Sequence, residues 1–429
     1  MTSLGHLLAV VALVLFALLL VPACIVAAQV LAHARRRRPG SAVTFAPTTA
    51  RGPVVVLVPA HDEAAGIDQT VSALLPQLHA DDRVLVVADN CSDATAEIAR
   101  AAGAEVVERF DGARGKGFAI AHGINHLRQH PPCAVVIVDA DCELGPEALE
   151  ALLSDLERTA RPVQARYLMV NARDSSLPRR MAEFAWRVHN WVRPSGWHRL
   201  HMPCQLMGTG MAFSWDMLRE APLANASIVE DMKLGIDLAL EGCPPVYCER
   251  ALVTSRFPIS REATRTQRTR WEHGHLGMIA HELPRLLIGA AKRSDALLLG
   301  LALDLAVPPL AMLAGGMVLS CGLALLGALL GSAMAPLMLS TSLLGLFALT
   351  VLIGWQRRGR DLVSLAELLT APWYILARLP IYLRFAFNRQ RQWVRTDRES
   401  AESICRERAD GNRRSDRSPS RRRAHRHPR

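Results

Sequence analysis

The chain has 429 residues, a formal net charge of +10 and 50% hydrophobic residues. This length allows one large domain or two smaller ones. The apolar residues gather at the two ends and the nine cysteines lack paired short spacings, so the composition indicates a membrane protein and argues against a zinc-binding cluster.

The N-terminal apolar run predicts a membrane span. Residues 7–31 carry no charge and are numerous enough for one bilayer crossing at about 1.5 Å per residue. The basic stretch 34–40 follows this run rather than preceding it, which argues against a cleaved signal peptide. By the positive-inside rule these arginines stay in the cytosol, so the chain after them begins on the cytosolic side.

Residues 50–290 alternate between strand-like and helix-like segments, which predicts an α/β domain on a largely parallel sheet. Strands are expected within 54–64, 83–93, 104–110 and 134–144, and helices over 67–78, 94–104 and 118–127. In open α/β sheets ligands bind beyond the carboxyl ends of the strands. The polar residues at these ends are His61, Asp62, Glu63, Asp89, Asn90, Asp139 and Asp141.

The fourth of these strands runs into Asp139 and Asp141. In an extended segment residues i and i+2 point to the same side, so both carboxylates would face one small volume. They would repel by about 3 kcal/mol at an effective dielectric constant near 20, and a cation between them would remove this repulsion. The alternative is that one aspartate caps a helix over 145–153, where Pro146 fits a first-turn position.

A short loop and a second acidic pair follow. The loop 114–117 places two glycines around Lys116, which suits phosphate oxygens although the loop lacks P-loop spacing. Further on, Ser227 and Glu230 form a capping box at the start of a helix. The box does not need Asp231, whose carboxylate could instead accept a proton from a hydroxyl group.

Residues 265–274 combine cations with an aromatic side chain. Gln267, Arg270 and Trp271 fit a helix at the membrane surface, with Trp271 in the interfacial belt. The functional alternative pairs Arg270 with a diphosphate and Trp271 with the face of a ring. His273 and His275 suggest metal binding only weakly, because both are also compatible with solvated positions.

The C-terminal third predicts further membrane segments. Residues 296–355 are apolar with Asp304 as the only charge, and predict two crossings broken near 331–336, or three shorter ones. Residues 361–388 fit amphipathic segments in the cytoplasmic interface. The basic tail 389–429 is expected to be disordered, and either attracts anionic lipids or is simply solvated.

Taken in order, these segments resemble the membrane-bound family 2 glycosyltransferases of GT-A fold, which include cellulose, hyaluronan, chitin and poly-N-acetylglucosamine synthases. Ceramide glucosyltransferases form a related family. The resemblance spans about residues 54–275 and rests on the stretches VPAHDE, VVADNCSDATAEIA, DAD, MGTGMAF, VED and QRTRW. It implies a Rossmann-like GT-A domain in the cytosol, inserted between transmembrane helices of a multi-pass protein of the inner (cell) membrane.

The resemblance also assigns residues. Asp231 would be the general base, with Glu230 beside it, and Asp141 with Asp139 would bind Mg²⁺ or Mn²⁺. The donor would contact Pro59, His61, Glu63, Asp89, Lys116, Asp139 and Arg270. The acceptor would contact Gly208, Thr209, Gly210, Gln267 and Trp271.

The implied reaction is inverting, metal-dependent transfer of a hexose from a UDP-sugar to a growing polysaccharide or glycan, with a β-linkage. One alternative is the addition of a single sugar to a membrane lipid, and a remote one is a non-catalytic basic scaffold. The expected partners are the UDP-sugar, a glycan or lipid acceptor, membrane lipids and polysaccharide export or assembly proteins. Nucleic acid is not expected to bind.

Overall fold

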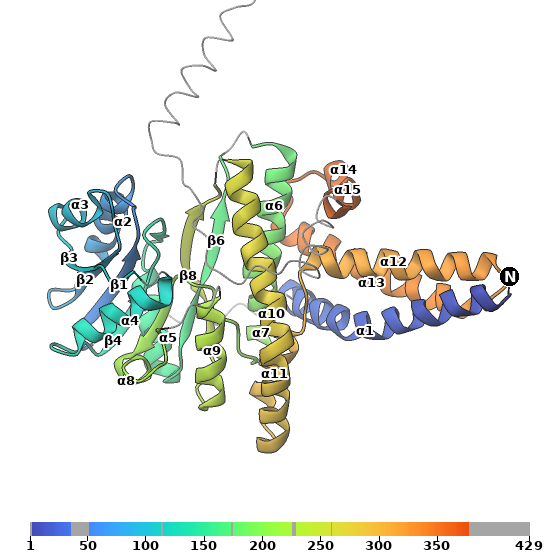
Figure 1. Ribbon diagram of the computed structural model, residues 1–429, viewed down its shortest axis with the longest axis horizontal. Coiled ribbons are helices and arrows are strands. Elements are labelled where there is room, and N and C mark those ends of the chain that lie inside the picture. The colour runs from blue at the N-terminus through green and yellow to red at the C-terminus, as the bar shows by residue number, and fades with distance from the viewer. Residues whose placement is uncertain are drawn as a thin grey trace, which may run out of the picture.

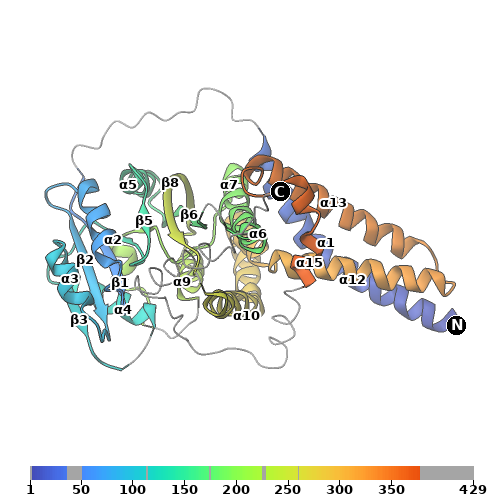
Figure 2. The same ribbon diagram turned by 90° about the horizontal axis from the view of Figure 1, so that it is seen from above.

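The computed structural model describes residues 2–35, 51–112, 115–172, 175–224, 229–258 and 260–376. They form an α/β domain, a layer of helices beside it, and a bundle of long apolar helices that projects from this layer (Figure 1). Seen from above, the N-terminus lies at the far tip of the bundle (Figure 2). The α/β domain is therefore inserted between bundle helices from the two ends of the described chain.

The described part of the α/β domain contains an eight-stranded sheet with the order β3-β2-β1-β4-β7-β6-β8-β5. Its strands are β1 Val54–Ala60, β2 Arg83–Asp89, β3 Glu105–Arg109, β4 Ala134–Ile137, β5 Glu143–Leu144, β6 Val163–Val170, β7 Met211–Ser214 and β8 Val246–Arg256. The first four strands in this order run parallel, as predicted, whereas β7 is antiparallel to both of its neighbours. The sequence patterns thus indicate the parallel half and miss the mixed half.

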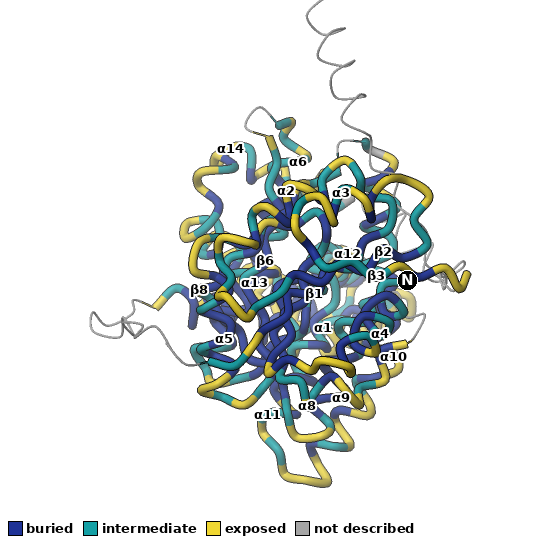
Figure 3. The backbone as a smooth tube through the Cα atoms, turned by 90° about the vertical axis from the view of Figure 1, so that its left-hand side faces the viewer, coloured by how far each residue is buried: buried dark blue, intermediate teal, exposed yellow. Residues whose placement is uncertain are grey.

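Helices cover both faces of this sheet. One face packs against α2 Ile67–Leu74, α3 Thr95–Ala101 and α5 Ala148–Thr159, and the other against α4 Lys116–Leu127, α8 Trp215–Leu218 and α9 Glu230–Leu240. A 3-10 turn, Leu75–Gln77, extends α2. Successive residues of β1 enter opposite core clusters, which explains its uninterrupted apolar sequence. Figure 3 shows β1 in dark blue at the centre of the domain.

The two aspartates of the D-A-D stretch lie in a turn rather than in a strand. β4 ends at Ile137, and the backbone N–H of Cys142 donates to the carbonyl oxygen of Asp139 at 3.0 Å. The expectation of an extended segment through Asp141 is therefore wrong. The carboxylates still converge, because the turn brings them to the same side.

The helix-cap alternative for these aspartates is also wrong. α5 begins at Ala148, and Glu147 occupies its N-cap position without a side-chain hydrogen bond. Pro146 precedes this cap, so it is not a first-turn residue. Neither aspartate is needed to start the helix.

Three described helices are long and apolar enough to cross a membrane: α1 Thr2–Ala34, α12 Leu310–Leu329 and α13 Ala335–Arg358. The break between α12 and α13 falls at residues 330–334, close to the predicted 331–336. The first part of the apolar block instead forms α11, Ala296–Leu305, whose 10 residues are too few for a crossing. α11 packs against α9 and the long helix α10, Arg261–Arg293.

A buried polar network joins the bundle to the α/β domain. Helix α6, Leu177–Arg187, continues through a π-helical turn, Val188–Val192, into α7, Arg193–Arg199. Arg193 Nε donates to Gln29 Oε1 of α1 at 2.7 Å, and its terminal nitrogen lies 3.0 Å from Asp304 Oδ1. Asp304, the single charge of the apolar block, is thereby paired.

Two short helices, α14 Leu365–Leu368 and α15 Ala371–Leu376, begin the segment predicted to be amphipathic. Glu367 of α14 forms an ion pair with Arg180 of α6, which ties this segment to the helical layer. The remainder of that segment, the basic tail 389–429, arginines 36–38 and the expected cap Ser227 lie outside the described residues. Within them α9 begins at Glu230 and ends at Leu240, two residues before Gly242.

Candidate active site

The turn that carries Asp139 and Asp141 is held from two sides. Thr70 Oγ1 of α2 donates a hydrogen bond to the carbonyl oxygen of Ala140 at 2.7 Å. The backbone N–H of Asp139 donates to Thr209 Oγ1 at 3.0 Å. Because both threonines are buried, the turn is fixed by its surroundings and does not need a ligand to order it.

The side chains of this turn suit a hard divalent cation. Ligand atoms of Asp139, Asp141 and Cys142 lie within 4.8 Å of one another. Burial, followed by the charges of the two aspartates, raises the pKa of the Cys142 thiol well above its usual value, so the thiol stays protonated at neutral pH. The available ligand atoms are then carboxylate oxygens, which Mg²⁺ and Mn²⁺ prefer.

Lys116, the first residue of α4, links this turn to residues 207–210, the loop before β7, which is called the acceptor loop after its predicted contact. Its ammonium forms an ion pair with Asp139 and donates to the carbonyl oxygen of Gly208 at 2.6 Å. Burial opposes this charge, but Asp139, Glu230 and Asp231 favour it, and the net effect raises the pKa of Lys116. The lysine is therefore a permanent cation among three carboxylates.

Glu230 and Asp231, the first residues of α9, line a pocket together with Lys116. The rest of the lining consists of Gly117, Ile120, Met211, Pro222, Leu223 and Leu234. Burial and then the charge of Asp231 raise the pKa of Glu230 to about 7, and burial also raises the pKa of Asp231. Carboxylates perturbed in this way and facing a pocket are candidates for proton transfer.

Gly208 brings the acceptor loop against these groups. A Cβ atom at this position would lie 3.3 Å from Asp231 Oδ2 and 3.6 Å from Lys116 Nζ. The backbone has a φ of +89°, which glycine adopts without strain. The missing side chain therefore lets the loop lie directly beside the candidate base and the lysine.

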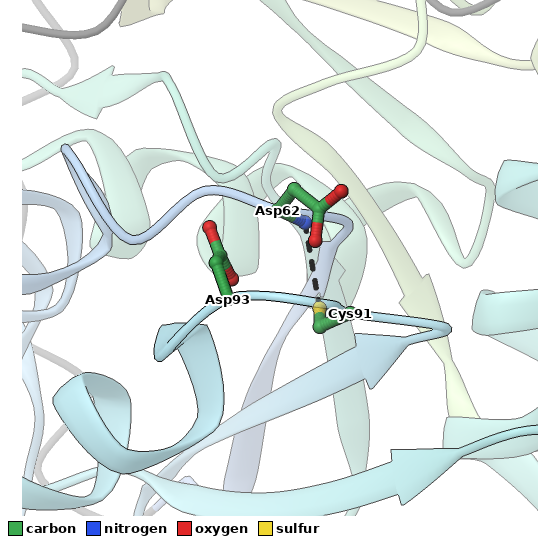
Figure 4. A group of neighbouring side chains, drawn as sticks. All are labelled: Asp62, Cys91 and Asp93. Atoms are coloured by element: carbon green, nitrogen blue, oxygen red, sulfur yellow. Dashed lines mark hydrogen bonds between the residues drawn. The ribbon is translucent and has the colours of Figure 1, made fainter.

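The loops that follow β1 and β2 brace each other. The backbone N–H of Asp62 donates to Cys91 Sγ at 3.4 Å, and that of Ser92 donates to Asp62 Oδ1 at 2.6 Å. Figure 4 shows Asp62, Cys91 and Asp93 side by side. Asp93 Oδ2 accepts from the N–H of Ala64 at 3.2 Å. Since both carboxylates already accept backbone N–H groups, this cluster fastens the two loops together rather than indicating a second metal site.

The predicted nucleoside contacts lie on these braced loops and on β1. Pro59 is in β1, beside Val87 of β2. His61 Nδ1 lies 2.6 Å from the carbonyl oxygen of Asp89, and the N–H of Glu63 donates to Thr95 Oγ1 at 2.8 Å. These residues therefore gather at the carboxyl ends of two neighbouring parallel strands.

Asp89 is buried, with an exposed fraction of 6%. Its carboxylate forms an ion pair with Arg109 and accepts a hydrogen bond from Asn90 Nδ2 at 2.8 Å. Burial raises the pKa of Asp89, while Arg109 opposes this effect. A direct contact between Asp89 and the donor stays a prediction, because part of its hydrogen-bonding capacity is already used.

Helix α10 carries the remaining predicted residues. Gln267 is buried, and the ring of Trp271 packs on that of Trp186 with centroids 4.9 Å apart. Trp271 and Met207, the start of the acceptor loop, contact the same core cluster of the sheet. These contacts do not support the membrane-belt interpretation of Trp271. Arg270 lies on the same helix, one residue before it.

The expectation of solvated histidines on α10 is wrong. His273 is 1% exposed. His275 Nε2 lies 3.4 Å from the carbonyl oxygen of Leu305, and burial, followed by the charge of Arg193, lowers the pKa of His275 to about 4. Both are internal histidines, and neither belongs to a group of metal ligands within the described residues.

The contacts above join one group of predicted residues directly: Lys116, Asp139, Asp141, Gly208, Thr209, Glu230 and Asp231. A second group, Pro59, His61, Glu63 and Asp89, lies at the ends of β1 and β2. The third, Gln267, Arg270 and Trp271, lies on α10. Gly210 follows Thr209 in the acceptor loop, close to Ala165 of β6.

Sequence patterns miss two side chains that support the site. Arg109, the last residue of β3, neutralises Asp89, and the gathering of polar residues at strand ends would have found it. Gln164 of β6 accepts from the N–H of Met207 at 2.7 Å and donates to the carbonyl oxygen of Thr209 at 2.9 Å. The only sequence signal for Gln164 is an amide residue within a mostly apolar strand.

A family model described as "Glycosyltransferase like family 2" matches residues 51–274, just over half of the chain. The match includes the turn of Asp139 and Asp141, the pocket and α10 as far as Gly274. The chain belongs to this family. This family 2 chain thus carries a family 2 glycosyltransferase-like domain, and its α/β domain has a GT-A-like fold.

Individual relatives are more distant. The probable glycosyltransferase YdaM of Bacillus subtilis is 25% identical over 238 residues, which cover 52% of this chain and 55% of that protein. The family 2 chain therefore spans about half the length of this curated relative. A mannosyltransferase from Pyrobaculum calidifontis, solved with GDP-mannose and Mn²⁺, is 17% identical and has a TM-score of 0.54, covering 89% of this chain and 100% of that chain.

Glucosyl-3-phosphoglycerate synthase from Mycobacterium tuberculosis, solved with Mn²⁺, UDP and glucosyl-3-phosphoglycerate, is a further structural match. It is 22% identical, covers 55% of this chain and 85% of that chain, and has a TM-score of 0.37. The likeness to the mannosyltransferase, at low identity but over nearly the whole chain, shows a shared fold that includes the helices outside the α/β domain.

Proposed function

We propose that the family 2 chain is an inverting glycosyltransferase of the inner (cell) membrane with its site in the cytosol. It transfers a hexose from a UDP-sugar to a growing polysaccharide or other glycan through a β-linkage. The observation that carries this proposal is that Lys116, which lines a pocket with Glu230 and Asp231, also forms an ion pair with Asp139 in the neighbouring turn.

On the donor side, the carboxylates of Asp139 and Asp141 hold Mg²⁺ or Mn²⁺. When bound, this cation neutralises negative charge on the departing nucleoside diphosphate. Lys116 adds a fixed positive charge beside the same turn, and Arg270 extends it from α10. The mannosyltransferase of P. calidifontis was solved with Mn²⁺, which agrees with this assignment.

On the acceptor side, Asp231 removes the proton from the attacking hydroxyl group, with Glu230 beside it. Gly208 keeps the space in front of Asp231 open, because its position carries no side chain. A single base and an in-line displacement invert the configuration of the anomeric carbon. The acceptor sugar lies along the residues Gly208, Thr209, Gly210, Gln267 and Trp271.

The nucleoside lies on the braced loops that follow β1 and β2. Pro59 of β1 contacts it together with His61 and Glu63 of the loop that follows, and Asp89 contacts it from the end of β2. The buried pair of Asp89 and Arg109 supports this position, because it fixes the edge of the loop. The proposal that the donor carries uracil as its base is tested most directly by a panel of donors that includes GDP-mannose.

The membrane placement rests on α1, α12 and α13. Arginines 35–38 follow α1, so the positive-inside rule puts the N-terminus outside and the α/β domain in the cytosol. Residues 361–376 begin the segment expected in the cytoplasmic interface. The basic tail 389–429, which lies outside the described residues, would either attract anionic lipids or simply be solvated. Polysaccharide export or assembly proteins are the further partners expected of a polymer-forming enzyme.

A second candidate is the transfer of one sugar to a membrane lipid. It is favoured by the direct packing of α7 on α1, which keeps the α/β domain against the bundle. Product size separates the two candidates, since a glycan polymer has graded lengths and a glycolipid has one extractable size.

The test compares membranes that contain wild-type protein, D141N or D216N. Each is given a panel of UDP-sugars and GDP-mannose with Mg²⁺, Mn²⁺ or a chelator, while the released nucleoside diphosphate and the product size are measured. Asp216 is a suitable control because its side chain is 80% exposed and belongs to a surface ion pair with Arg219. D216N removes one acidic charge, as D141N does, but at a position outside the site.

We expect the wild-type protein to release UDP only with a divalent metal and one particular UDP-sugar. This release should be lost in D141N and should persist in D216N. Equal release by D141N and wild type would remove the metal turn from the mechanism. Release with GDP-mannose alone would overturn the uracil assignment and leave the site chemistry intact.

A further inference from the structure

Arginines gather around one tryptophan at the foot of the bundle. Trp191 lies in the π-helical turn between α6 and α7, where the C-terminal ends of α1 and α13 meet the helical layer (Figures 1 and 2). A terminal nitrogen of Arg357 in α13 donates to the carbonyl oxygen of Ala34 in α1 at 2.6 Å. The two helix ends are therefore joined at this point.

Two of these arginines have a structural task. Arg199 donates to the carbonyl oxygens of Ala32 at 3.3 Å and Arg35 at 3.2 Å, and lies 3.7 Å from Glu249. Arg357 caps the same helix end. Both neutralise the partial negative charge at the C-terminus of α1, so neither calls for a further ligand.

Arg166 and Arg358 lie against the tryptophan ring itself, and Arg358 Nε also lies 3.4 Å from His33 Nε2 of α1. The guanidinium carbons of Arg166 and Arg358 lie 4.5 Å and 3.9 Å from the centroid of the Trp191 ring. Within the described residues neither forms an ion pair with a carboxylate, and Arg166 Nε is buried without a hydrogen-bond partner. Cation–π contact offsets only part of the cost of holding two like charges at one ring.

The surrounding charges leave this position positive. The charged groups that act on Arg358 are one carboxylate, Glu249, and three guanidinium groups, those of Arg166, Arg199 and Arg187. Glu249 accepts a hydrogen bond from Trp191 Nε1 at 3.1 Å and is shared with Arg199. An anion at the Trp191 ring would supply the missing counter-charge and a partner for the buried nitrogen.

Strand β6 connects this position to the active site. Gln164 and Arg166 are two residues apart and lie on the opposite face of the strand from the core residues Ala165 and Tyr167. Gln164 holds the acceptor loop through Met207. Residues two apart on a strand are separated by about 7 Å, so the arginine site begins one side chain beyond the acceptor loop, on the way to the bundle.

We propose that Arg166, Trp191 and Arg358 form a binding site for the phosphate group of a membrane lipid. Guanidinium groups bind phosphate oxygens in paired, charge-assisted hydrogen bonds. A tryptophan and arginines at the ends of spanning helices lie at the level of lipid headgroups. The site rests on the proposed membrane placement of α1 and α13, and does not depend on the chemistry of transfer.

The test measures lipid binding by the purified full chain in detergent, without donor or metal. Native mass spectrometry and the melting temperature are followed with phosphatidic acid, a polyprenyl phosphate, phosphatidylglycerol, diacylglycerol and inorganic phosphate. The variants are R166Q/R358Q, the charge-retaining R166K/R358K, and the control R83Q. Arg83, the first residue of β2, forms an ion pair with Glu105 of β3 at 2.9 Å. Strand β2 lies on the side of the α/β domain that faces away from the bundle (Figure 1).

We expect phosphate-bearing lipids to bind and stabilise wild type and R83Q, and binding to weaken about tenfold or more in R166Q/R358Q. R166K/R358K should keep part of the binding, because the charges remain although the paired hydrogen bonds of the guanidinium groups are lost. Stronger binding of phosphatidic acid and the polyprenyl phosphate than of phosphatidylglycerol would mean that the site recognises a terminal phosphate, as on a lipid acceptor. Equal binding of all three would mean that it recognises the phosphate of any lipid headgroup.

Three outcomes overturn the site. The first is equal lipid binding by R166Q/R358Q and wild type. The second is an equal loss of binding in the lysine and glutamine double variants, which would assign the effect to packing around Trp191. The third is stabilisation of the protein by inorganic phosphate but by none of the lipids. Since no nucleotide is present, these outcomes are independent of whether the chain releases UDP.

Discussion

Lys116 lies between two groups of carboxylates, and its charge acts on both. It pairs with Asp139 on the metal side and lowers the pKa of Glu230 and Asp231 on the other, against the effect of their burial. A short glycine-flanked loop is a weak motif, yet its lysine connects the donor and acceptor halves of the site. The charge of a single residue, Lys116, therefore influences the protonation of the two acidic residues in the pocket.

Replacing Lys116 by glutamine should move the acid limb of the kcat–pH profile upward. Without the ammonium the pKa of Glu230 and that of Asp231 both rise, so the base is deprotonated only at higher pH, by about one pH unit or more. The measurement is UDP release at saturating donor between about pH 5 and 9. Lys233, paired with Asp237 one turn further along α9, provides the control K233Q. An unchanged limb in K116Q would contradict this coupling.

The two acidic residues should differ in their effect on rate. D231N removes the proposed base and should lower kcat by about 10²–10⁴-fold, with little change in the KM of the donor. E230Q should lower kcat less, because Glu230, with a pKa raised to about 7, is partly protonated at neutral pH already. Initial rates at saturating donor decide between them. A larger loss in E230Q would exchange the two roles.

At the scale of single elements, the loop before β7 depends on a glycine that the sheet leaves no room to replace. Gly210 has a φ of +64°, and a Cβ atom there would lie 2.6 Å from Val253 Cγ2 and 2.7 Å from Ala165 Cβ. Gly242, after α9, has a φ of +99° but no neighbour within 4 Å. Both need left-handed backbone, and only Gly210 is also confined.

This contrast predicts different stabilities. G242A should lower the free energy of unfolding by about 1 kcal/mol, the cost of left-handed backbone in alanine. G210A should lower it by about 3 kcal/mol, because overpacking against Val253 and Ala165 is added. Melting temperatures of the two purified variants give the comparison. Equal shifts would mean that the loop before β7 relaxes around the added methyl group.

At the scale of the whole molecule, Asp304 decides how the bundle attaches to the α/β domain. It pairs with Arg193 of α7 and accepts a hydrogen bond from Gln29 Nε2 of α1 at 2.7 Å. D304A should lower the stability by about 3–5 kcal/mol, because it leaves Arg193 buried without a counter-charge. The apolar pair R193M/D304L should recover most of this loss. A D304A melting temperature equal to that of wild type would show that the network does not hold the parts together.

Much of the site could be predicted from the sequence because its residues follow apolar strands. Asp139, Asp141, His61 and Asp89 stand at strand ends, where a parallel sheet presents ligands. The turn after β4 was the exception. Its geometry comes from Thr70 and Thr209, which belong to segments far away in the chain.

The sequence by itself determined the parallel half of the sheet, the three long apolar helices and the choice of candidate site residues, because these follow from local periodicity and from short motifs. Only the tertiary structure decided the contacts made by Lys116, the burial of His273 and His275, the pairing of Asp304, and the arginines around Trp191. Each of these depends on residues distant in sequence becoming neighbours, and burial in that neighbourhood changes both their charges and their partners.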